Sequence, residues 1–82
     1  MLFLYLVTRK PTARSVGYDE YDSFVVAAAT EQDARCTAPN GQPWDERTHF
    51  YWVTPEETQA KLIGVADGSL LPGVVCASFN AG

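Results

Sequence analysis

The chain opens with a run of apolar residues that fills both alternating positions of residues 2–8. One set of alternate positions holds leucine, and the other holds phenylalanine, tyrosine and valine: Leu2, Leu4, Leu6; Phe3, Tyr5, Val7. An extended segment with two apolar faces is typical of a strand with neighbours or cover on both sides. We therefore predict a central strand here, followed by a connecting loop over residues 10–17, where Pro11 and Gly17 stand among small polar residues.

A second strand and a helix are predicted next. Apart from Ser23, residues 23–29 are apolar, and they end in three alanines, which allow close packing of another element. This strand is most simply antiparallel to the first. Thr30 can cap a helix by accepting the free amides of its first turn, and Glu31 and Asp33 near that end favour the helix dipole. The helix must be short, since Pro39-Asn40-Gly41 is a strong stop signal.

The second half of the chain predicts further strands. Residues 48–53 have strand composition, and Pro55 starts a helix of one or two turns that ends before Lys61. Residues 62–66 and 74–79 are predicted to form a terminal hairpin with a seven-residue loop. Trp44 lies in a predicted loop and should fold back as a lid over the core.

Together these elements predict an α+β fold: an antiparallel sheet of four to five strands with one main short helix packed on one face. Eighty-two residues suffice for a single domain, residues 1–82, and 46% apolar with 20% charged residues is typical of a folded protein. The apolar run at residues 1–7 is too short to span a bilayer, and the positive charges follow it, unlike those of a signal peptide. We therefore expect a cytoplasmic protein.

Charge and composition exclude several kinds of chemistry. A net charge of −4 disfavours general binding to the nucleic-acid backbone. Cys36, His49 and Cys76 are isolated in sequence, so no metal site, cofactor site or cysteine nucleophile is predicted, and both cysteines are expected to be reduced and half-buried. Neighbouring acidic pairs point in different directions, and no glycine-rich loop is followed by a phosphate-binding lysine. No residue pattern specifies a reaction.

One segment stands out as a candidate binding surface, the acidic aromatic segment at residues 18–22: Tyr18, Asp19, Glu20, Tyr21, Asp22. Tyrosines supply rigid contact area, and the carboxylates around them steer a basic partner. The structural alternative is a solvated start of a strand whose tyrosines pack on the chain itself, with the nearby basic residues neutralising the acids. A second candidate is a ligand pocket between the helix, a tryptophan and the first loop: Arg9, Lys10, Arg14, Trp44.

The order of several segments resembles a group of small, mostly uncharacterised proteins of tailed bacteriophages. The resemblance covers nearly the whole chain and is carried by residues 5–9, 17–28, 63–66 and 77–82. It implies an accessory protein that acts in the cytoplasm of the host bacterium by binding and inhibiting or redirecting a host protein, as anti-CRISPR proteins and other defence inhibitors do. It carries no catalytic motif.

The sequence therefore favours a non-enzymatic protein that binds a host protein through the acidic aromatic segment. Two alternatives stay open. One is a small-molecule or nucleotide-binding protein that uses the Arg9 to Arg14 loop and Trp44. The other is a self-associating structural component, in which the predicted edge strand at residues 74–79 pairs with another chain.

Overall fold

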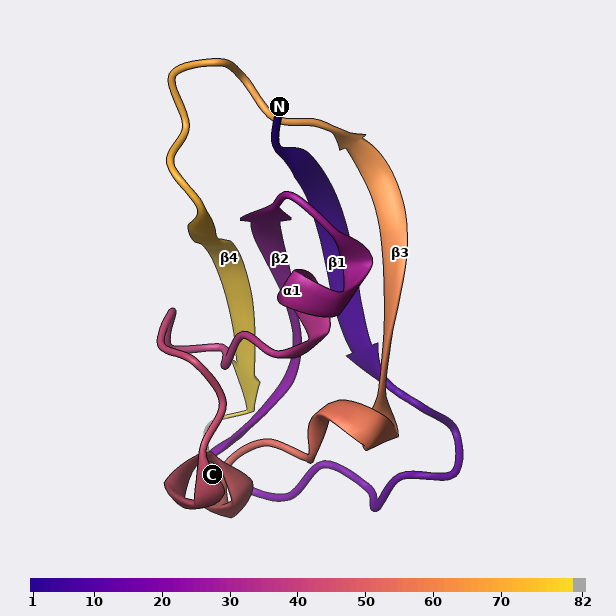
Figure 1. The fold of residues 1–82 in the computed structure, drawn as a ribbon. Coiled ribbons are helices and arrows are strands. Elements are labelled where there is room, and N and C mark those ends of the chain that lie inside the picture. The colour runs from indigo at the N-terminus through magenta and orange to yellow at the C-terminus, as the bar shows by residue number, and fades with distance from the viewer. Residues whose placement is uncertain (81–82) are drawn as a thin grey trace.

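Four strands form one antiparallel sheet in the order β3-β1-β2-β4 (Figure 1). The computed structural model describes residues 1–80, except for the side chain of His49. The strands are β1 (Phe3–Arg9), β2 (Glu20–Ala28), β3 (Thr58–Val65) and β4 (Gly73–Asn80). The helical elements are α1 (Glu31–Arg35) and the 3-10 helices η1 (Glu46–Phe50) and η2 (Pro55–Glu57). The predicted α+β fold with an antiparallel sheet and one short helix is confirmed.

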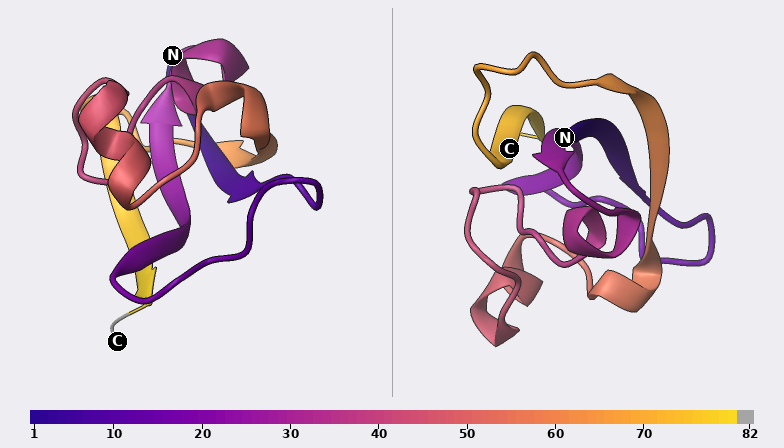
Figure 2. Two further views of the ribbon diagram at one scale, coloured as in Figure 1. Left: turned by 90° about the horizontal axis from the view of Figure 1, so that it is seen from below. Right: turned by 45° about the horizontal axis from the view of Figure 1, so that its top comes forward.

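The three helical elements all lie on one side of the sheet (Figure 2). The core forms between them and the sheet, and its largest fully buried side chains are Trp52, Phe24, Val7, Val26, Val53 and Thr58. β1 lies between β3 and β2, as the apolar character of both its faces predicts. Its other face, which includes the half-buried Leu4 and Leu6, carries none of the described helices.

Helix α1 begins where the sequence predicts. The Thr30 hydroxyl accepts a hydrogen bond from the amide of Asp33 at 3.1 Å, and Glu31 and Asp33 lie in the first turn. Ala34 is fully buried against the sheet beside the small residues at the end of β2. From the last turn, the Arg35 guanidinium donates to the carbonyl of Pro55 at 2.9 Å and ties α1 to η2.

The prediction of a strand at residues 48–53 is wrong, because this stretch contains η1 and the turn that follows it. Asp45 caps η1: its carboxylate accepts the amides of Arg47 and Thr48, while the Thr48 hydroxyl accepts the amide of Asp45. This reciprocal cap satisfies the first amides of a helical turn. The aromatic residue Trp52 of this stretch is fully buried and packs in the core.

The predicted terminal hairpin is also wrong. β3 pairs with β1 and β4 pairs with β2, so the last two strands lie at opposite edges of the sheet. Residues 66–72 cross one end of the sheet to connect them (Figure 1). β3 also begins at Thr58, four residues earlier than predicted, because η2 ends at Glu57.

Three smaller expectations have mixed outcomes. Trp44 packs on the core cluster as predicted. Both cysteines are free, and Cys36 is half-buried, but Cys76 is exposed on the edge strand β4, where the sequence predicts a half-buried thiol. Among the described residues, no helix is long and apolar enough to cross a membrane.

Candidate protein-binding surface

The acidic aromatic segment turns the chain from the first loop into β2. Asp19 has a positive φ of 59°, a conformation that aspartate tolerates better than most residues. Its amide donates to the carbonyl of Asn80 at 2.7 Å, and the Asn80 side chain donates to the carbonyl of Gly17 at 2.9 Å. The segment is thus held against the end of β4, although the two lie sixty residues apart in sequence.

Glu20 is a structural member of the segment. Its carboxylate accepts hydrogen bonds from Arg9, at 2.9 Å, and from Arg14. The side chains of Arg9 and Glu20 are only 8% and 15% exposed. Arg9 at the end of β1 and Arg14 in the loop that follows therefore neutralise this acid, and Glu20 does not belong to the exposed part of the predicted binding surface.

The same arginines join three parts of the chain. The Arg9 guanidinium donates to the carbonyl of Tyr21 at 2.8 Å and lies over the ring of Trp52, 5.3 Å from its centroid. Arg14 donates to the carbonyl of Trp52 at 3.0 Å. We call these four residues the arginine network: Arg9, Arg14, Glu20, Trp52. It links β1, β2 and the chain after η1.

The arginine network sets the ionisation of Glu20. Burial by itself would raise the pKa of this carboxyl, but the hydrogen bonds from Arg9 and Arg14 and the positive charge of Arg14 lower it below its ordinary value. Glu20 is therefore held as a carboxylate in the folded protein, where its charge is compensated.

The other members of the segment face solvent. Tyr18 is 79% exposed, and Asp19 and Asp22 are both exposed. The Asp22 carboxylate accepts from the hydroxyls of Ser23, at 2.8 Å, and Ser78, at 3.1 Å, so it is held at the seam between β2 and β4. Two carboxylates and one tyrosine of the predicted surface are thus exposed to solvent.

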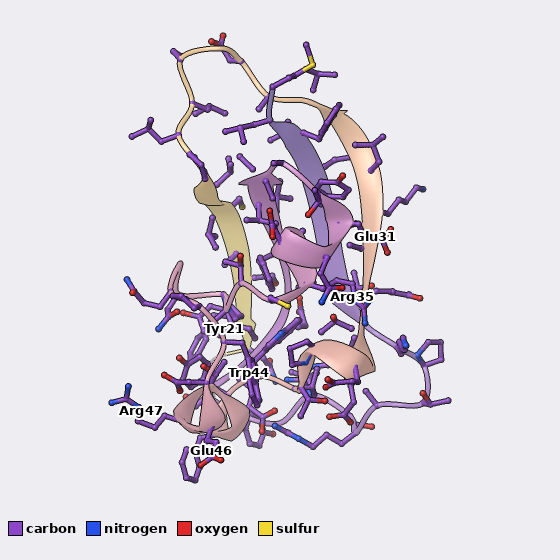
Figure 3. All side chains as sticks on the ribbon, viewed as in Figure 1. Tyr21, Glu31, Arg35, Trp44, Glu46 and Arg47 are labelled. Carbon is purple, nitrogen blue, oxygen red and sulfur yellow. The ribbon has the colours of Figure 1, made fainter. Side chains whose placement is uncertain are left out.

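Tyr21 is half-buried and lines a hollow beside these exposed residues. Figure 3 shows Tyr21 at the lower end of the sheet, near η1. Its ring makes edge-on contacts with Tyr51, at a centroid distance of 5.8 Å, and with Phe79, at 4.9 Å. We call this hollow, of about 380 Å³, the aromatic hollow, and its lining residues are Asp19, Tyr21, Asn40, Tyr51 and Phe79.

The sequence did not predict three of these lining residues. Asn40, Tyr51 and Phe79 come from a turn, the end of η1 and β4, and only the fold brings them together. The Asn40 amide donates to the Tyr51 hydroxyl at 3.1 Å and fixes that ring. Of the three, Phe79 alone belongs to a segment that the sequence marks as a possible contact, the edge strand predicted at residues 74–79. Its exposed fraction there is 47%.

The alternative ligand pocket is not assembled in the described structure. Arg9 stacks on Trp52, while Trp44 lines a separate hollow with Asp45, Arg47 and Tyr51. Lys10 pairs through its backbone amide with the carbonyl of Glu57. Figure 3 places Trp44 between α1 and η1, on the face of the sheet that carries the helices.

No protein-family model, curated protein or solved structure matches this chain. Among the side chains that the structure describes, no group of three or more histidine, cysteine, aspartate or glutamate residues could hold a metal ion. The His49 side chain lies outside that description.

Proposed function

We propose that this chain is a non-enzymatic accessory protein, of the kind found in tailed bacteriophages, that binds a host protein and inhibits or redirects it. The defence systems of the host, CRISPR systems included, are the target class. The observation that carries the proposal is an exposed tyrosine and two exposed carboxylates beside the aromatic hollow: Tyr18, Asp19, Asp22.

The chemistry of this surface suits a basic protein surface. Aromatic rings that are already fixed by packing contribute contact area at little cost in conformational entropy. The carboxylates and the net charge of −4 speed the approach of a positively charged partner. Proteins that bind nucleic acid present such surfaces, so occupying one of them would block a nucleic-acid channel by mimicking phosphate charge.

The experiment compares two double variants that each remove two carboxylates, from different places on the protein. Asp19→Asn/Asp22→Asn removes the exposed carboxylates of the surface. Glu31→Gln/Glu56→Gln removes two exposed carboxylates from α1 and η2 and changes the net charge equally, from −4 to −2. A partner is first captured from a bacterial lysate and identified, and its association rate is then measured with each protein.

We expect Asp19→Asn/Asp22→Asn to slow association about tenfold at low salt, and the difference to shrink as the ionic strength rises. Glu31→Gln/Glu56→Gln should slow it much less, since its charges lie away from the surface. Equal rates for the two variants would show that only the total charge matters and would refute the proposed surface.

A further inference from the structure

The two edges of the sheet differ in how well they are protected against another strand. Each edge strand has one bulge, at Ile63 in β3 and at Val75 in β4, where the pairing register shifts. Before its bulge, β3 carries the exposed Lys61, and a charged side chain on an edge discourages strand pairing. After its bulge, β4 runs without a charged side chain through residues 76–80. β4 is therefore the open edge.

The backbone of β4 presents hydrogen-bonding groups to solvent. The carbonyl of Asn80 accepts from the amide of Asp19 and so points toward β2. Successive residues of a strand point their amides and carbonyls in opposite directions. The amides and carbonyls of Ala77 and Phe79 consequently point to the free edge, where a further strand can pair with them.

This open edge adjoins the proposed binding surface. The ring of Phe79 lies 4.9 Å from that of Tyr21 and lines the aromatic hollow on one face of the sheet. On the other face, the Ser78 hydroxyl donates to the Asp22 carboxylate. Two adjacent residues of an added strand would point to opposite faces, one beside Phe79 and the other beside Ser78.

We propose that β4 accepts an extended segment of the partner protein as a fifth strand, with arginine at the positions opposite Ser78 and Phe79. This inference rests on the proposed function and names how the partner is recognised. Side chains directly opposite one another on paired strands have Cβ atoms about 5 Å apart, so the first arginine reaches Asp22 one strand further in. The second arginine stacks on Phe79 and Tyr21, since a guanidinium binds both aromatic faces and carboxylates.

The probe is an eight-residue peptide of alternating threonine and valine with two adjacent arginines at its centre. Its control has two glutamates at the same positions. We expect the arginine peptide to shift the amide resonances of Ala77 and Phe79 and the ring resonances of Tyr21, and the glutamate peptide to bind at least tenfold more weakly. Shifts confined to β3, or no shifts at millimolar arginine peptide, would overturn the proposal.

A proline variant tests the backbone pairing directly. Ala77→Pro removes one amide that points to the free edge, where proline is tolerated, and Ala77→Val keeps that amide. Ala77→Pro should weaken peptide binding at least tenfold and Ala77→Val should not. Hydrogen exchange on the unmodified protein supplies a second measurement that does not depend on how the variant folds. The arginine peptide should slow exchange of the Ala77 and Phe79 amides, and unchanged exchange would contradict strand addition.

The outcomes separate this inference from the function on which it rests. Binding that survives Ala77→Pro but is lost in Asp19→Asn/Asp22→Asn would refute strand addition and support the acidic surface. Binding lost only in Ala77→Pro would support pairing with the backbone of β4, but it would refute both the acidic surface and the arginine proposed opposite Ser78. A dimer of the protein alone in dilute solution, abolished by Ala77→Pro, would identify a second copy as the occupant and overturn the proposal.

Discussion

Glu20 and Asp22 are two carboxylates at the start of the same strand, and the fold gives them opposite roles. Glu20 is 15% exposed and accepts hydrogen bonds from two arginines. Asp22 is exposed, and its only described partners are two serine hydroxyls. Neighbouring acidic residues in a sequence thus need not form one site. A carboxylate that lies beside a cation of the chain stabilises the fold, and a carboxylate without such a neighbour can contact a partner.

The division follows from the cost of burying charge. A carboxylate that loses water needs a cation and further hydrogen bonds, and Arg9 of β1 and Arg14 of the first loop supply both to Glu20. Within the described structure, no salt bridge joins Asp22 to a cation of the chain. Its negative charge is therefore directed outward, where a basic partner can meet it.

The largest expected effect is on stability, from Glu20→Gln. This change leaves the nearly buried Arg9 without its anion, and breaking such a pair costs about 3 kcal/mol. A protein of this size has a total stability on the order of 4–12 kcal/mol, so the loss is large. Urea denaturation measures it. Asp22→Asn is the matched control and should change the free energy of unfolding by less than about 0.5 kcal/mol. Similar losses in both variants would contradict the division of roles.

Truncation of the two tyrosines extends the comparison to the aromatic side chains. Tyr21→Ala removes a half-buried ring that packs on Tyr51 and Phe79, and should lower the free energy of unfolding by about 2 kcal/mol. Tyr18→Ala removes a ring that is 79% exposed, and should leave stability within about 0.5 kcal/mol while weakening partner binding. Thermal unfolding and partner binding, measured on both variants, check the contrast. A Tyr18→Ala protein that binds as well as the parent would remove Tyr18 from the surface.

The pH dependence of stability should isolate Glu20 further. Because the folded protein lowers the pKa of Glu20, the unfolded state binds its proton first as the pH falls, and the stabilisation by this group is lost through the acid range below its ordinary value of 4.5. The difference in stability between the parent protein and Glu20→Gln should therefore be complete near pH 7 and shrink as the pH falls through the folded pKa. Denaturation at a series of pH values measures this. A difference that stays constant down to pH 2 would show that the charge of Glu20 is not what stabilises the fold.

The sequence predicts local structure well where a local interaction decides it. The Thr30 cap and the proline that starts η2 are both confirmed, because each depends on residues close together in the chain. The strand predicted at residues 48–53 is wrong because the Asp45 carboxylate accepts the amides of Arg47 and Thr48 and so caps a helical turn, despite the strand composition of this stretch.

Strand pairing and the site depend on contacts that no local pattern contains. The local pattern predicts a hairpin of β3 with β4, yet β3 pairs with β1 and β4 pairs with β2. The sequence predicts the acidic aromatic segment as one surface, but it does not predict which of its side chains are buried and which are exposed. Glu20 meets Arg9 only in the folded sheet, and Tyr21 meets Phe79 across a strand pair.

The smallest expected effect separates charge from conformation at Asp19. This residue holds a positive φ of 59°, which costs an L side chain some conformational energy and costs glycine none. Asp19→Gly should therefore remove a carboxylate of the proposed surface without straining the turn. Asp19→Val removes the same charge but places a β-branched residue at a positive φ, and should cost about 1–2 kcal/mol. Because the two variants lose one charge each, they should slow partner association equally while differing in chemical denaturation. Unequal association rates would mean that the shape of this turn, and not its charge, is what the partner recognises.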